Sequence, residues 1–131
     1  MDRIHEMKTP KEIVDIMMSK DQFSSWLNLK IETIDKGSCS LSCVIKKEML
    51  NGFEIAHGGI AYSLADSTLA FAANSYGFQS FSIETSISHL VKVNEGDTLK
   101  SISNEIHRGN KTALYQIEIF KFWVKSSDII F

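Results

Sequence analysis

One stretch decides the fold: His57-Gly58-Gly59-Ile60-Ala61-Tyr62-Ser63-Leu64-Ala65-Asp66-Ser67-Thr68-Leu69-Ala70-Phe71-Ala72-Ala73-Asn74-Ser75-Tyr76-Gly77. After its two leading glycines, this stretch predicts a helix of about four turns over residues 57–77, closed by Gly77. Its apolar residues fall on several faces rather than on one stripe, which is typical of a helix buried on most sides. We therefore expect a central helix, with a sheet packed closely against its many alanines.

Asp66 is the only charged residue in this apolar helix. A buried carboxylate without a partner is costly, so its presence needs a reason. One interpretation places Asp66 on a solvated edge of the helix together with Ser63 and Ser67. The other makes it a catalytic acid or base, because such groups concentrate in active sites.

The two glycines at the helix start expose backbone N–H groups at the positive end of the helix dipole. Such N–H groups bind anions, including the oxyanion that forms when a carbonyl is attacked. The alternative is that Gly58 and Gly59 only allow a tight turn into the helix.

The spacing of Gly58 and Asp66 constrains any shared chemistry. Eight residues separate them, so they lie roughly 12 Å apart along the helix axis. A base and an oxyanion donor for one carbonyl must both lie about 3 Å from the reacting atoms. If both groups act on one substrate, the second must come from another copy of the chain, which predicts a two-fold dimer.

Several short motifs occur at fixed spacing along the chain: Met49-Leu50-Asn51-Gly52, His57-Gly58-Gly59, Ser63-Leu64-Ala65-Asp66, Ala72-Ala73-Asn74-Ser75, Gly96-Asp97-Thr98-Leu99 and Gly109-Asn110-Lys111-Thr112. Together they resemble the hot-dog-fold thioesterases of the phenylacetic-acid-degradation (PaaI-like) family, over roughly residues 23–119. The resemblance implies an acyl-coenzyme A thioesterase for small or aryl-acetyl groups, working as a homodimer or a dimer of dimers. It implies no cofactor besides the coenzyme A of the substrate.

The resemblance assigns roles to individual residues. Asp66 becomes the general base or the nucleophile, and the Gly58 N–H the oxyanion donor, with Gly59 behind it. His57 lies beside the site, where it positions the loop, bonds a water or contacts the substrate carbonyl. The alternative is a helix-start histidine bonded to backbone. Asn51 is either a turn residue or a contact to the substrate or the helix.

Three further residues are candidates for holding the substrate: Ser67, Arg108 and Lys111. The two basic residues flank a predicted hairpin turn and would bind coenzyme A phosphates; the alternative is ordinary solvated surface charge. The chain departs from the family at His89-Leu90-Val91-Lys92, where an aromatic followed by Leu-Arg-Pro is usual. This departure predicts a different strand exit or acyl pocket. The family's last strand and its glycine-containing tail are also altered, from Phe122 to Phe131.

Two other functions occur on this fold or suit this sequence. A hot-dog dehydratase is disfavoured, because the His-Phe-Pro-type loop of that group is absent. A non-catalytic acyl-coenzyme A-binding or regulatory domain stays open as the alternative. Thiol release from acyl-coenzyme A esters separates enzyme from binding domain.

The composition is that of one ordinary globular domain over residues 1–131, with 44% hydrophobic and 23% charged residues. A net charge of −2 gives no reason to expect nucleic acid. No apolar run approaches membrane-spanning length, and the polar start does not resemble a signal peptide, so we expect a cytoplasmic protein. Cys39 and Cys43 are expected as buried thiols, and the histidines lack metal-ligand spacing, so no metal site is expected.

The remaining segments predict a helical start followed by strands. An N-terminal helical segment is expected over 1–28. Its helix starts with Thr9 as the cap, Pro10 at the first helical position and Glu12 reaching back to the cap. Alternating residues predict a hairpin of two strands, from Leu29 and from Cys39, with a turn at Asp35-Lys36-Gly37. A long strand over Phe81–His89 and a meander from Leu99 to about Val124 follow. The result is an α+β hot-dog fold, a curled antiparallel sheet wrapped around one long central helix.

Overall fold

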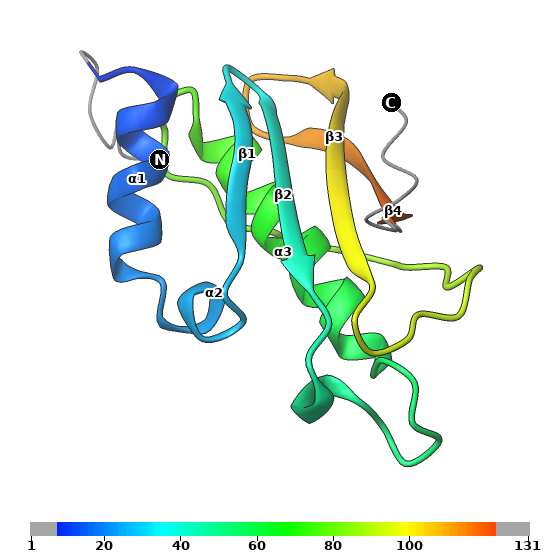
Figure 1. Ribbon diagram of the computed structural model, residues 1–131. Coiled ribbons are helices and arrows are strands. Elements are labelled where there is room, and N and C mark those ends of the chain that lie inside the picture. Colours follow the sequence, from blue (N-terminus) through cyan, green and yellow to red (C-terminus); the bar gives the residue numbers. More distant parts are fainter. Residues whose placement is uncertain (1–7, 123–131) are drawn as a thin grey trace.

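The computed structural model describes residues 8–122, which form a four-stranded antiparallel sheet with a long helix packed across one face (Figure 1). The strands follow the order β1-β2-β3-β4, so each pairs with its neighbour in the sequence. This arrangement confirms the predicted hot-dog architecture.

The N-terminal helical segment contains α1 (Pro10–Lys20) and α2 (Gln22–Trp26), which lie beside β1 in Figure 1. The Thr9 hydroxyl accepts from the Glu12 N–H at 3.2 Å, and the Glu12 carboxylate accepts from the Thr9 N–H at 3.4 Å. This reciprocal pair is the predicted capping box, which satisfies two otherwise unpaired donors. Asp21 caps α2 with its side chain, because its carboxylate accepts from the Ser24 N–H at 2.8 Å.

The sheet comprises β1 (Lys30–Asp35), β2 (Ser38–Val44), β3 (Thr98–Arg108) and β4 (Ala113–Phe122). The predicted hairpin between the first two strands is confirmed, and its turn contains Gly37 at φ +70°, a conformation that glycine adopts without strain. The strand predicted from Leu99 and the one that follows are also confirmed, as β3 and β4. The end predicted near Val124 lies outside the described residues, as does the altered terminus.

Strands β2 and β3 are paired over a short length only, at Ser42↔Lys100, Cys43↔Leu99 and Val44↔Thr98. Beyond that point serine hydroxyls replace the backbone ladder. The Leu41 N–H donates to Ser101 Oγ at 2.9 Å, and the Cys39 N–H donates to Ser103 Oγ at 2.8 Å. The buried donors are therefore satisfied where the two strands diverge.

Helix α3 (Gly58–Asn74) packs its buried face on the sheet and shares a core with it. Its fully buried apolar residues are Leu64, Phe71 and Ala72. Its other faces are half-buried or exposed, so the expectation of burial on most sides is wrong for a single chain. The boundaries 57–77 also shorten: Asn74 ends the helix, and Gly77 follows at φ +93° with its N–H donating to the Asn74 carbonyl.

Both cysteines are buried free thiols on the helix-facing side of β2, as predicted. Burial raises the pKa of the Cys39 thiol to about 12. Burial also raises the pKa of the Cys43 thiol, which nearby Lys46 partly offsets. Neither thiol is therefore a nucleophile at neutral pH.

The long strand predicted over Phe81–His89 is wrong for the single chain. Residues 79–92 run from α3 toward β3 without joining the sheet, and most of their side chains are exposed. A strand needs a backbone partner, and this segment pairs with none of the four strands of the sheet. Among the described residues, no helix is long and apolar enough to cross a membrane.

Candidate active site

The first turn of α3 forms the centre of the candidate site. His57 is the N-cap residue, and its Nδ1 accepts from the Gly59 N–H at 2.9 Å. Its carbonyl accepts from the Ile60 N–H at 3.0 Å. Because Nδ1 accepts, the ring proton resides on Nε2. This geometry matches the interpretation of His57 as a helix-start histidine bonded to backbone.

Gly58 is left with a free backbone donor. Its N–H has no hydrogen-bond partner within residues 8–122, whereas the next two N–H groups are both taken by His57. The free N–H lies at the positive end of a 17-residue helix, where an anion is stabilised. Of the two glycines, Gly58 is therefore the one that can receive an oxyanion.

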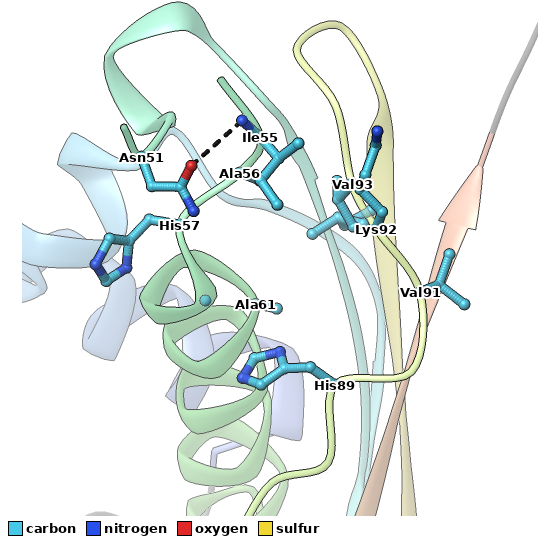
Figure 2. Close-up of a pocket in the computed structure, with 11 residues that line it drawn as sticks. Asn51, Ile55, Ala56, His57, Ala61, His89, Val91, Lys92 and Val93 are labelled. Carbon is cyan, nitrogen blue, oxygen red and sulfur yellow. Dashed lines mark hydrogen bonds between the residues drawn. The ribbon is translucent and has the colours of Figure 1, made fainter. Parts of the chain in front are cut away.

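A cavity of about 200 Å³ opens beside this turn (Figure 2). Its lining combines apolar and polar side chains from the loop before α3, from α3, from the segment before β3 and from β3: Asn51, Ile55, Ala56, His57, Gly58, Ala61, His89, Val91, Lys92, Val93 and Leu99. An apolar pocket with a few polar groups at one end suits a small acyl chain whose carbonyl sits at the polar end.

Asn51 is a turn residue, which is one of the two roles that its sequence position left open. Its Oδ1 accepts from the Phe53 N–H at 2.9 Å and from the Ile55 N–H at 3.4 Å, which is an Asx turn. The residue also lines the cavity, and its amide nitrogen makes no hydrogen bond within the described part of the chain. The turn thus holds Asn51 with a donor still available.

His89 lies against Gly58 from the opposite side of the turn. A Cβ added to Gly58 would lie 3.3 Å from His89 Nε2 and 3.4 Å from its Cε1. Figure 2 shows the imidazole pointing at the first turn of α3, with the His57 ring beyond it. Neither His89 nor Lys92 was singled out as a site residue from the sequence. The sequence feature that could have identified them is the departure from the family pattern at these two positions.

Asp66 is not part of the cavity of its own chain. Its side chain is exposed on α3 and makes no hydrogen bond or ion pair among residues 8–122. The single chain thus matches the solvated-edge interpretation and separates Asp66 from Gly58, as the spacing along one helix requires.

Ser67 requires a correction, because it is neither on that edge nor in the cavity. It is 8% exposed, and its hydroxyl shares a 2.8 Å hydrogen bond with that of Ser24 on α2. Ser67 thus joins the central helix to the N-terminal segment, and its contact with substrate stays a prediction.

Arg108 and Lys111 lie at the hairpin between β3 and β4, and the hairpin meets the opposite end of α3. The Arg108 guanidinium stacks on the Tyr76 ring, 3.7 Å from its centroid. Nearby, Glu105 accepts from the hydroxyls of Tyr76 at 2.9 Å and Tyr115 at 2.8 Å. Burial, followed by this bond to Glu105, raises the pKa of both phenols. Within one chain the two basic residues do not reach the cavity.

The cavity therefore offers donors for a carbonyl oxygen and an apolar space for its substituent. Its lining contains no carboxylate, so a carboxylate base would come from outside this cavity. Among residues 8–122 no group of three or more His, Cys, Asp or Glu side chains could hold a metal ion.

Several known proteins are similar to this chain in sequence and in fold. The thioesterase superfamily matches residues 53–122. A protein of Archaeoglobus fulgidus is 37% identical over 109 residues, covering 83% of this chain and 71% of its own. The acyl-coenzyme A thioesterase PaaI of Escherichia coli is 34% identical, over 79% of this chain and 74% of its own.

The solved structures agree with the sequence comparisons. The E. coli PaaI protein of the phenylacetic acid degradation operon superimposes with a TM-score of 0.84 at 31% identity, over 86% of this chain and 81% of that one. A variant of the phenylacetic acid degradation protein PaaI from Thermus thermophilus gives 0.75 at 26% identity, over 77% and 87%.

Proposed function

Because the chain belongs to the thioesterase superfamily, we propose that it hydrolyses acyl-coenzyme A with a small or aryl-acetyl acyl group. The products are the free acid and coenzyme A, and no further cofactor takes part. The observation that carries the proposal is the free N–H of Gly58, a residue that lines a small cavity at the positive end of α3. A thioester carbonyl bound there develops its negative charge against a donor that is already in place.

The base in this proposal is Asp66 of a second copy of the chain. Its carboxylate is exposed on α3 without a partner among the described residues, and its own helix holds it far from its own Gly58. A two-fold arrangement of two chains would bring each Asp66 to the other chain's first turn. We therefore propose a homodimer, or a dimer of dimers, with two sites at the interface.

The exposed segment before β3 supports this dimer. Phe81, Ile83 and Leu90 are 79%, 88% and 88% exposed on an extended backbone that has no strand partner within residues 8–122. Apolar side chains on an unpaired extended segment favour pairing with another chain. The same segment of a second copy is the occupant that would restore the strand expected from the sequence.

Two chemical routes fit these groups. As a general base, Asp66 takes a proton from water while the oxygen adds to the thioester carbon. The tetrahedral oxyanion, held by the Gly58 N–H, then collapses with cleavage of the C–S bond, and the thiolate leaves and is protonated. As a nucleophile, Asp66 displaces the thiolate to give a mixed anhydride, which water then hydrolyses.

The remaining polar groups have supporting roles in the proposal. The free amide of Asn51 contacts the carbonyl or the attacking water, while its Oδ1 fixes the turn. His57 positions the first turn, because its ring and carbonyl hold the next two N–H groups. Arg108 and Lys111 of the hairpin would meet coenzyme A phosphates on assembly of the dimer.

The experiment is thiol release from a panel of acyl-coenzyme A esters, from acetyl to phenylacetyl and long-chain. We expect steady turnover that falls steeply for chains too large for a cavity of about 200 Å³. Asp66→Asn removes the base and should lower kcat on the order of a thousandfold. Asp15→Asn, which alters a carboxylate paired with Lys11 on α1, is the matched control and should leave kcat unchanged.

The alternative is a non-catalytic acyl-coenzyme A-binding domain, which the lack of a carboxylate in the cavity lining of one chain favours. Stoichiometric binding of the esters without thiol release would establish that alternative and contradict the enzyme. Normal turnover by Asp66→Asn would instead remove this residue from the mechanism.

A further inference from the structure

The His89 side chain lies beside Gly58, whose N–H is the proposed oxyanion donor. Apart from the residues next to Gly58 and the backbone of α3, the three heavy atoms nearest to an ideal Cβ on Gly58 all belong to the His89 ring, at 3.3, 3.4 and 4.0 Å. Nε2 is the nearest of them, so the nitrogen-bearing edge of the ring faces the first turn of α3 (Figure 2).

The imidazole has no partner of its own in this position. Neither ring nitrogen makes a hydrogen bond or an ion pair within the described part of the chain, and two neighbours in the cavity, Ala61 and Val91, are apolar. The ring is exposed, so its nitrogens are open to solvent and to a ligand that enters the cavity. A ligand group that accepts a hydrogen bond can therefore pair with the ring.

The helix itself supplies too few donors for an oxyanion. Gly59 donates to His57 Nδ1, and Ile60 donates to the His57 carbonyl, so of the first three N–H groups of α3 only that of Gly58 is free. Oxyanions of acyl transfer are usually held by more than one donor, and each donor contributes strongly in a water-poor site. A second donor must therefore come from outside α3, and His89 Nε2 lies on the same side of Gly58 as the cavity.

We propose that His89 is a further catalytic residue, whose Nε2–H donates a hydrogen bond to the thioester carbonyl oxygen held by the Gly58 N–H. The ring keeps its proton throughout, so the group acts by charge stabilisation and no bond to it is made or broken. This inference rests on the proposed thioesterase function and adds a side-chain donor to its site.

The test compares two substitutions, one that keeps only the N–H donor of the imidazole and one that keeps only its planar ring. His89→Gln keeps an N–H donor of similar reach but loses the ring, and His89→Phe keeps a planar ring but loses the donor. Both side chains are tolerable because His89 is exposed and outside the core. The measurement is kcat and KM for thiol release from the best ester of the panel, with the thermal unfolding midpoint of each variant.

We expect His89→Phe to lower kcat on the order of a hundredfold with little change in KM. His89→Gln should retain kcat to within about tenfold of the wild type, because its N–H replaces the lost donor. Both variants should unfold near the wild-type temperature.

Two outcomes would overturn the inference while leaving the thioesterase intact. One is a His89→Phe enzyme with wild-type kcat, which would show that the donor is dispensable. The other is a His89→Gln enzyme as slow as His89→Phe or slower, which would show that the ring shape alone matters. A wild-type protein that releases no thiol from any ester would overturn the proposed function itself, and this inference with it.

Discussion

The two ends of α3 differ in how completely their polar groups are satisfied. At the last turn, Asn74 bonds the backbone of Ser80 in both directions, and Ser75 Oγ accepts from the Gly37 N–H at 2.7 Å. At the first turn, the Gly58 N–H, the Asn51 amide and the His89 ring have no partner within residues 8–122. The last turn, where the polar groups named are hydrogen-bonded, is called the saturated end here, and its bonds stabilise the fold. At the first turn, donors without a partner beside a cavity are available to a ligand.

Beside the last turn of α3, aromatic and charged side chains also bind one another. Glu105 accepts from two tyrosine hydroxyls, and Arg108 stacks on one of the rings. Gly37 fits against the Tyr76 hydroxyl with no room for a side chain. This end should therefore respond to substitution in stability, and the first turn should respond in turnover.

The largest expected effect comes from removing the free donor at the first turn. Gly58→Pro deletes the N–H at the first helical position, where proline is compatible with the helix and where His57 is already extended at ψ 137°. We expect kcat to fall about a hundredfold to a thousandfold. The control is Gly58→Ala, which adds a Cβ in the same place near His89 but keeps the N–H. Equal losses in the two variants would show that crowding, not the donor, is responsible.

The second prediction tests whether the two halves of the site come from different chains. Gly58→Pro and Asp66→Asn are each expected to be nearly inactive, but a mixed dimer has one intact site, with Gly58 from one chain and Asp66 from the other. Co-refolding equal amounts should restore about a quarter of the wild-type kcat, since half of random dimers are mixed and carry one of two sites. Activity that stays at the level of the separate variants would contradict the shared site.

At the saturated end, Gly37→Ala should destabilise the fold by about 2–3 kcal/mol, through strain at φ +70° and a collision with Tyr76. The measurement is the free energy of unfolding in urea. Gly96→Ala shares the positive φ but has open space, and Gly52→Ala has open space without a positive φ. The loss in the free energy of unfolding should be largest for Gly37→Ala, smaller for Gly96→Ala and smallest for Gly52→Ala. A loss for Gly37→Ala no larger than that for Gly96→Ala would exclude the collision with Tyr76.

Glu105→Gln should cost about 1 kcal/mol of stability, because one acceptor of two hydroxyls loses its charge. The carboxylate contributes to the raised pKa of Tyr115, so tyrosinate should form at lower pH in the variant, as measured by ultraviolet titration. A phenol with a raised pKa stabilises the fold below the ordinary tyrosine pKa of about 10, and that stabilisation is lost as pH rises above it. Glu118→Gln, which affects a bond to Asn104, is the control.

The smallest effect concerns Arg108, which belongs to the saturated end but is proposed to bind coenzyme A. Arg108→Glu should raise KM for acyl-coenzyme A several-fold, since exposed charge pairs contribute little. Arg108→Lys keeps the charge and should restore KM. A change in the unfolding midpoint with an unchanged KM would restrict Arg108 to its contact with Tyr76.

The pattern of the sequence predicted most of the local structure. The Thr9 capping box, the hairpin turn at Gly37 and the buried thiols of β2 follow from short-range rules on caps, turns and alternation, and the structure confirms them. The prediction of a strand over Phe81–His89 was wrong for the single chain. Alternating apolar and polar residues indicate that a segment fits the surface of a sheet, but they do not show that a backbone partner is present. The solvated edge was wrong for Ser67, which is buried against Ser24, a partner 43 residues away in the sequence.

The sequence by itself determined the helix, its two leading glycines and the eight-residue spacing to Asp66, because helical geometry depends only on residues near one another. The bond from the Gly59 N–H to His57 is also local, because the two residues are neighbours at the start of the helix. Only the tertiary structure decided that His89 lies beside Gly58, since it arrives from a segment 31 residues further along the chain. That contact depends on where the chain returns in space, which no local pattern encodes.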